Sequence, residues 1–151
     1  MKKFEFRLQS VLDWRTRQLE IQESRLQALL GELAGFDAAL EKIEADSREA
    51  EREAIASGNT QELAALDPFR ARQRRERERV LARRAACERR IDEQRERVVE
   101  AGRGVRLLER LRDRKLADWH AESAKELEAL AAESFLSRWQ RGRLRERGAG
   151  D

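Results

Sequence analysis

Apolar side chains recur at alternating steps of three and four residues over positions 12–54. Ten of the thirteen positions in this series are apolar, and no proline interrupts it. The series comprises Leu12, Arg15, Leu19, Gln22, Leu26, Leu29, Leu33, Phe36, Leu40, Ile43, Ser47, Ala50 and Ala54. A mean spacing of 3.5 residues holds one narrow stripe against a partner helix, which is typical of a coiled coil. The pattern predicts a long helix over about residues 8–56 that needs a second helix along its stripe.

A break follows at residues 57–60, where the sequence reads Ser-Gly-Asn-Thr. Gly and Asn commonly end helices, so this stretch is the predicted turn. Thr60, with Glu62 close behind, can start the next helix; alternatively residues 61–66 form a short turn and the helix restarts at Asp67, just before Pro68. The predicted second helix spans about 61–141, and the Gly- and Arg-containing residues 142–151 are expected to be a frayed tail.

The second helix carries a leaner stripe with the same alternation. Its members are Val80, Arg84, Cys87, Ile91, Gln94, Val98, Ala101, Val105 and Leu108. A fold at Gly58 places Leu26 opposite Ile91 and Leu12 opposite Val105, whereas a parallel dimer would stack Arg15 on its own copy. We therefore expect an all-α fold, a long antiparallel two-helix coiled-coil hairpin with an overhanging C-terminal helix, as a single domain over 1–151 and a monomer when free.

Beyond about residue 110 the first helix no longer covers the second. The stripe there loosens, and its apolar members are Leu116, Trp119, Leu127 and Leu130. A helix that has lost its partner exposes such a stripe, and exposed apolar stripes commonly bind other proteins. We expect these four residues to form an exposed partner surface.

The first residues show a short pattern with a period of two. Phe4, Phe6 and Leu8 alternate with charged residues, which is compatible with an added β-strand but, at a terminus, favours an apolar latch that leads into the first helix. Ser10 with Asp13 resembles a capping box, the arrangement in which two side chains satisfy the first backbone N–H groups of a helix.

Two glycines, Gly31 and Gly35, lie inside the first predicted helix. Each costs about 1 kcal/mol relative to Ala in a helix interior. Their presence indicates either close packing against a bulky partner or mild local flexibility.

Composition and charge agree with this picture. Charged residues make up 42% and aromatic residues 5% of the 151 residues, which is typical of long helices. The net charge of +3 divides into −3 over residues 1–60 and +6 over residues 61–151, which suits a chain folded back on itself. The single Cys cannot form an internal disulfide, and no apolar run reaches the length that spans a membrane. We expect a cytoplasmic protein without direct membrane insertion.

Residues for catalysis are scarce. His120 is the only His, so a His-pair metal site is excluded and a nucleophile–His–acid arrangement is disfavoured. Cys87 falls on the predicted stripe, where a small buried hydrophobe is the expected role. No phosphate-binding glycine loop is present. We expect no enzymatic activity, no catalytic residue, no cofactor and no metal.

The densest basic run covers residues 70–79 and contains six arginines. It suggests either a polyanion-binding face or a solvated surface that acidic residues compensate. Glu49, Glu51 and Glu53 would lie across the hairpin, and no aromatic residue alternates with the arginines for base stacking. We expect no nucleic-acid binding, and a nucleic-acid- or ribosome-associated coiled coil remains the alternative from a different class.

Both ends of the chain resemble one family. Residues 4–15, FEFRLQSVLDWR, resemble the F-x-F-x-L-x-x-V-L-x-x-R opening of the FliJ family, the small coiled-coil component of the bacterial flagellar export apparatus. Residues 105–115, VRLLERLRDRK, resemble that family's L-E-x-L-x-x-R/K segment. The resemblance implies an antiparallel coiled-coil stalk in the pore of the hexameric export ATPase, with its other end at the export-gate membrane protein.

The resemblance also implies sites and partners. It places ATPase binding at the paired chain ends, on Phe4, Phe6, Leu8, Leu12, Arg15, Leu108, Leu111 and Arg112. It places the gate-facing end at the turn of the hairpin, near Ala50, Ala54 and Phe69. Export chaperones are further implied partners, and the implied location is the cytoplasm, peripherally at the inner membrane. The equivalent stalk of a virulence type III secretion system is the nearest alternative.

Overall fold

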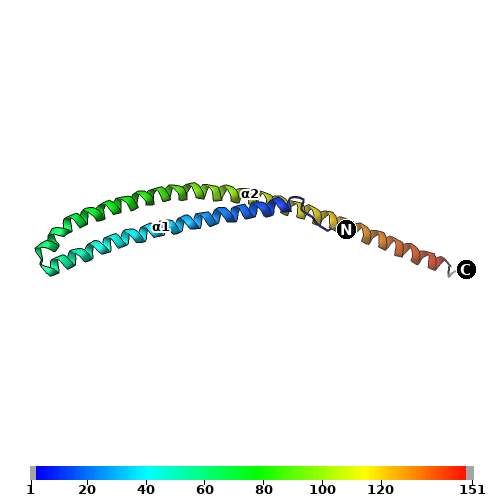
Figure 1. Cartoon of the computed structure of the whole chain (residues 1–151). Helices are drawn as coiled ribbons and strands as arrows, with labels where there is room; N and C mark the ends of the chain where they lie inside the picture. Colours follow the sequence, from blue (N-terminus) through cyan, green and yellow to red (C-terminus); the bar gives the residue numbers. More distant parts are fainter. Residues whose placement is uncertain (1–2, 149–151) are drawn as a thin grey trace. The chain divides into compact units, whose positions relative to one another are not determined.

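The computed structural model describes residues 3–148, with side chains as far as residue 145, and consists of two α-helices (Figure 1). Helix α1 spans Gln9–Ser57 and helix α2 spans Thr60–Gly148. The described residues contain no strand, so the predicted all-α helical hairpin is confirmed. Helix α2 continues past its predicted end near Arg141, and the expectation of a frayed segment over 142–148 is wrong. The expected tail over 149–151 lies outside the described residues.

The contacts divide the chain into two compact units. One unit is Arg15–Gly104, which contains most of α1, the turn and the first part of α2. The other unit joins the chain ends, Met1–Trp14 with Val105–Asp151. The first unit is the hairpin proper, and the second contains the candidate functional site.

Inside the hairpin unit, α1 and α2 run side by side in opposite directions (Figure 1). The core centres on Leu29, Cys87 and Ile91, and Leu26 packs against this cluster as the predicted register requires. The thiol of Cys87 lies 3.5 Å from the carbonyl oxygen of Leu29, so Cys87 behaves as the small buried residue that was predicted. A seam of 3.5-residue repeats thus accounts for the burial in this unit.

Arg15 is the exposed member of the α1 stripe. Its side chain lies over Gly104, where an added Cβ would come within 3.8 Å of the Arg15 guanidinium. A long cationic side chain fits at this stripe position because the opposing residue has no side chain.

Among the residues that the structure describes, three ion pairs join the two helices alongside the seam. They link Arg70 to Glu51 at 2.8 Å, Arg84 to Asp37 at 2.7 Å and Arg90 to Glu32 at 3.2 Å. The hydrogen bond to Asp37 raises the pKa of Arg84 above its ordinary value. Exposed pairs of this kind contribute little to stability. Of these three, only the pair of Arg70 with Glu51 involves the basic run over residues 70–79, and there it compensates one arginine across the hairpin.

The turn consists of Gly58 and Asn59. Gly58 has a φ of 63°, the left-handed conformation that ends many helices and that only Gly adopts without strain. The side-chain oxygen of Asn59 accepts a hydrogen bond from the backbone N–H of Gln61 at 3.0 Å, which makes Asn59 the N-cap of α2. Helix α2 therefore begins at Thr60 and contains Pro68, so the alternative restart at Asp67 is wrong.

The two glycines inside α1 have no close neighbours. A Cβ built on Gly31 or Gly35 would meet no heavy atom within 4 Å. The interpretation that they permit close packing against a bulky partner is therefore wrong within this chain.

Candidate functional site

The candidate site begins with the segment that precedes α1. Residues 3–6 have no regular secondary structure, and Arg7 and Leu8 form a turn. The N–H of Gln9 donates to the carbonyl of Phe6 at 3.0 Å, and the N–H of Leu12 donates to the carbonyl of Leu8 at 2.9 Å. These bonds start the helix at Gln9, one turn before Leu12.

The predicted capping box is wrong. Ser10 is already inside α1 and exposed, so it is not the N-cap. The carboxylate of Asp13 instead accepts a hydrogen bond from the side-chain amide of Gln9 at 2.9 Å. The two side chains are four residues apart and therefore neighbours on one helix face.

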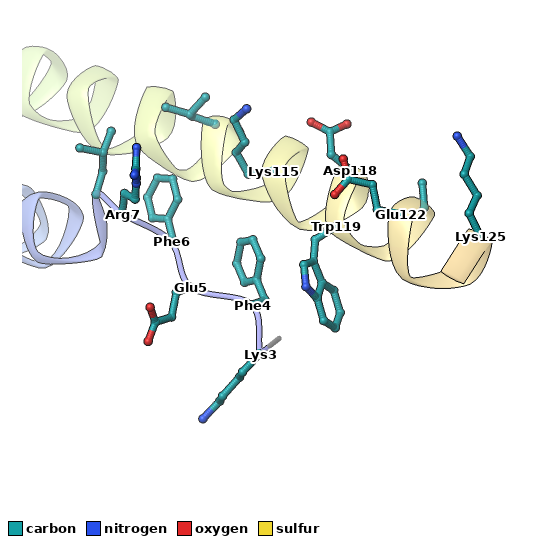
Figure 2. Close-up of a pocket in the computed structure, with 13 residues that line it drawn as sticks. Lys3, Phe4, Glu5, Phe6, Arg7, Lys115, Asp118, Trp119, Glu122 and Lys125 are labelled. Carbon is teal, nitrogen blue, oxygen red and sulfur yellow. The ribbon is translucent and has the colours of Figure 1, made fainter. Parts of the chain in front are cut away.

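The N-terminal segment lies along α2 (Figure 2). Phe4 and Phe6 lie on the side of the segment that faces α2, whereas Lys3 and Glu5 extend away from it. The rings of Phe4 and Trp119 are 6.1 Å apart between centroids and tilted by 59°, a favourable arrangement for an aromatic pair. The period-two pattern therefore functions as the predicted apolar latch, with Trp119 as its contact on α2.

This contact corrects the expected exposure of the α2 stripe. Trp119 and Leu116 are half-buried, and Trp119 also contacts His120 with a ring separation of 5.0 Å. Phe4 covers Trp119 because the N-terminal segment extends past the start of α1 along the second helix. Leu127 and Leu130, further along α2, are exposed.

A groove of about 940 Å³ lies between the N-terminal segment and α2. Its apolar lining comes from Phe4, Phe6, Leu8, Leu111, Trp119 and Ala121. Charged side chains of both signs surround it, namely Lys3, Glu5, Arg7, Lys115, Asp118, Glu122 and Lys125. An open, mostly uncharged floor with a mixed rim resembles a protein-binding surface more than a small-molecule site.

The structure brings together only some of the residues assigned to ATPase binding. Phe4, Phe6, Leu8 and Leu111 line the same groove. Leu12 is 4% exposed, so its role in this unit is packing. Leu108 and Arg112 are half-buried, and Arg112 forms an ion pair with Asp113 at 3.3 Å. Arg15 belongs to the hairpin unit and not to the unit that contains the groove.

The residues assigned to the gate-facing end belong to the hairpin unit. Ala54 is buried, and Ala50 and Phe69 are half-buried. Phe69 contributes to a shallow groove of about 410 Å³ with Arg72, Gln73, Arg75, Glu76 and Arg79. Phe69 therefore lines an open groove in this unit.

Sequence reasoning identified Leu111 and Trp119 on the α2 side of the candidate site but missed the charged residues beside them. Lys115, Asp118, Glu122 and Lys125 follow Leu111 at steps of four, three, four and three residues. This is the same alternation as the apolar stripe, displaced by one residue. The sequence therefore contains this spacing of charged residues. The structure shows that this face of α2 borders the groove, because the N-terminal segment packs beside it.

Within residues 3–148 no group of three or more His, Cys, Asp or Glu side chains could hold a metal ion. In the same described range, neither helix contains an apolar window long enough to cross a membrane. No family model, curated protein or solved structure matches this chain.

Proposed function

We propose that this chain is a non-enzymatic stalk and interaction component of the bacterial flagellar protein export apparatus. Its paired ends insert into the hexameric export ATPase, and the turn of the hairpin links that ATPase to the export-gate membrane protein. Export chaperones are the third class of partner. The chain acts in the cytoplasm, peripherally at the inner membrane.

One structural observation supports this proposal most strongly. The two segments that resemble the FliJ family are separated by about ninety residues in the sequence, yet residues 4–14 of the first and residues 105–115 of the second belong to one unit. Leu12 and Val105 are both buried there, with 4% and 6% of their surfaces exposed. Leu111 lines the same groove as Phe6 and Leu8. A shared binding surface explains why both segments carry the resemblance.

The proposed mechanism needs no chemistry in this chain. The groove presents Phe6, Leu8 and Leu111 to the ATPase. The mixed charges on its rim allow shallow contacts with several subunits in place of one deep binding pocket. At the hairpin turn, Phe69 is the residue proposed to contact the gate. A continuous helix pair can transmit position or torque between two such sites because each helix is held by its own hydrogen bonds and by the shared seam.

Co-purification with the cognate ATPase tests the proposal. The test variant combines Phe6→Ala, Leu8→Ala and Leu111→Ala, which truncates three of the groove's apolar side chains. The matched control combines Ile21→Ala, Leu63→Ala and Val99→Ala, three exposed apolar residues of the hairpin unit. We expect the wild type and the control to capture the ATPase and the test variant to lose it, provided that circular dichroism shows all three to be equally helical. Equal capture by the test variant would refute the assignment.

The same assay distinguishes flagellar from virulence export. The ATPases of the two systems are offered separately, and the proposal requires preference for the flagellar enzyme. Phe69→Ala is expected to retain ATPase capture and to lose binding to the cytoplasmic domain of the gate protein. Loss of both would indicate that Phe69 is needed for the hairpin itself.

A further inference from the structure

The last part of α2 exposes a second apolar face. Every described side chain from Ala124 to Arg145 is exposed. Phe135, Leu136 and Trp139 retain 68%, 55% and 49% of their surfaces in contact with solvent. At 3.6 residues per turn these three share a face with Ala132, whereas Leu127 and Leu130 lie on another face of the helix. An apolar face of this kind requires an occupant.

The residues of this face are arranged symmetrically about the peptide bond between Phe135 and Leu136. Ala132 lies three residues before Phe135, and Trp139 lies three residues after Leu136. Glu128 lies seven residues before and Arg143 seven residues after the same two positions. The order along the face is thus acid, small, aromatic, aliphatic, large aromatic and base.

When two copies of this face are placed in antiparallel orientation, each residue type lies opposite a compatible one. We propose that this face, which we call the C-terminal face (Glu128, Ala132, Phe135, Leu136, Trp139 and Arg143), binds a second copy of the chain in antiparallel orientation. A two-fold axis at the Phe135–Leu136 bond brings the same patch of both copies into contact, which is the usual arrangement in a homodimer.

Each layer of the pair then contains compatible side chains. The Trp139 ring of one copy packs over Ala132 of the other, where the small side chain leaves room for the indole. Glu128 meets Arg143 of the second copy at both ends of the patch. Arg143 already lies 4.3 Å from the centroid of the Trp139 ring in its own chain, so its guanidinium is held at the border of the patch. Gly142, beside it, has open space around it, so two helices can approach closely.

The charge of the surrounding helix favours the same orientation. Residues 122–133 carry four acidic side chains and one basic one, and residues 138–145 carry four arginines and no acid. Antiparallel pairing brings the acidic part of each copy to the basic part of the other, whereas parallel pairing would bring like charges together. An anionic membrane surface is disfavoured as the occupant because it would repel Glu128 and the acidic part.

This dimer is compatible with an intramolecular hairpin. The core of the hairpin unit is formed within Arg15–Gly104, and the C-terminal face lies outside it. The expectation of a monomer followed from the hairpin seam alone. The C-terminal face is short, so we expect a weak dimer that forms over roughly 1–100 µM.

Sedimentation equilibrium of the full chain tests the proposal. The mass of the wild type is expected to rise from that of one 17.6 kDa chain to twice that value over this range. Glu128→Arg places arginine opposite Arg143 twice in each dimer, and we expect it to weaken association at least about tenfold. Combining Glu128→Arg with Arg143→Glu restores opposite charges and is expected to restore the dimer.

Glu126→Arg is the matched control, because it changes the net charge equally but lies on the other side of α2; it should weaken association much less than Glu128→Arg does. The proposal is refuted if the wild type stays monomeric at 100 µM, or if Glu128→Arg associates as well as the wild type. A monomer that binds vesicles containing phosphatidylglycerol would also refute it and would identify a lipid surface as the occupant of the C-terminal face.

Discussion

The side-chain amide of Gln94 donates hydrogen bonds to two oxygens of Gln22 across the seam. The distances are 2.9 Å to the backbone carbonyl and 2.7 Å to the side-chain carbonyl of Gln22. Gln94 is 4% exposed, so these bonds replace the water that a polar side chain would otherwise contact. A buried polar pair in an apolar seam disfavours every other alignment of the two helices, because any shift leaves the amide without partners.

Gln94→Ala is expected to lower the free energy of unfolding by about 1–3 kcal/mol, through the loss of its two hydrogen bonds to Gln22. Urea unfolding followed by circular dichroism measures this change. Gln27→Ala replaces an exposed Gln of the same hairpin unit and should alter stability by less than about 0.5 kcal/mol. Equal effects of the two substitutions would show that the Gln94–Gln22 pair does not stabilise the seam.

Ile91→Ala removes buried apolar volume from the cluster with Leu29 and Cys87. We expect a loss of about 2–4 kcal/mol in the free energy of unfolding, since the neighbouring side chains collapse only partly into the cavity. The comparison is Val99→Ala, where the side chain is 49% exposed and the expected loss is below about 1 kcal/mol. A small effect at Ile91 would contradict the position of the core.

Alanine substitutions at two glycines should have opposite signs. Gly58→Ala forces a Cβ into the left-handed conformation of the turn and is expected to cost about 1–2 kcal/mol. Gly31→Ala adds a methyl group where no atom lies within 4 Å and should stabilise α1 by about 0.5–1 kcal/mol. Thermal unfolding of both variants measures whether each change in stability has the expected sign. A stabilising effect of Gly58→Ala would exclude the observed turn.

Phe4→Ala is expected to expose Trp119, because the Phe4 ring covers one side of the indole. The pair contributes about 0.5–1.5 kcal/mol beyond its buried area, so the N-terminal segment should also detach more readily. Fluorescence is measured in a background with Trp14→Phe and Trp139→Phe, which leaves Trp119 as the emitter. The emission should move to longer wavelength and acrylamide should quench it more strongly.

Phe135→Ala in the same background is the control for that experiment, since Phe135 is exposed on the later part of α2. It should leave the Trp119 emission unchanged when the protein is dilute. An unchanged spectrum in Phe4→Ala would mean that the N-terminal segment does not rest on Trp119 in solution.

The seam could be predicted from the sequence because its signal repeats many times. Stripe residues such as Leu29, Cys87 and Ile91 are buried where the alternation of three and four places them. The register between the two helices could also be predicted from the sequence. The chain reverses at Gly58, so the residues that lie opposite each other are found by counting from Gly58 along both stripes. Long periodic helices leave few alternatives for which residues meet.

Features that occur once were harder to predict. The period of two at Phe4, Phe6 and Leu8 is too short to identify the surface on which it rests, and the contact with Trp119 depends on tertiary structure. Pro68 and Gly142 are helix breakers by local propensity, but α2 continues through both. Neighbouring helix formers and packing can offset the cost of one such residue, and propensity alone does not reveal this.

The two-residue connection between Ser57 and Thr60 has a consequence for how the length of this chain can change during evolution. One residue added within either helix would rotate everything beyond it by about 100° and turn the stripe away from its partner. Tolerated insertions are therefore expected in whole heptads, gained or lost by both arms together. Related chains should differ in length by about fourteen residues at a time, centred on the turn.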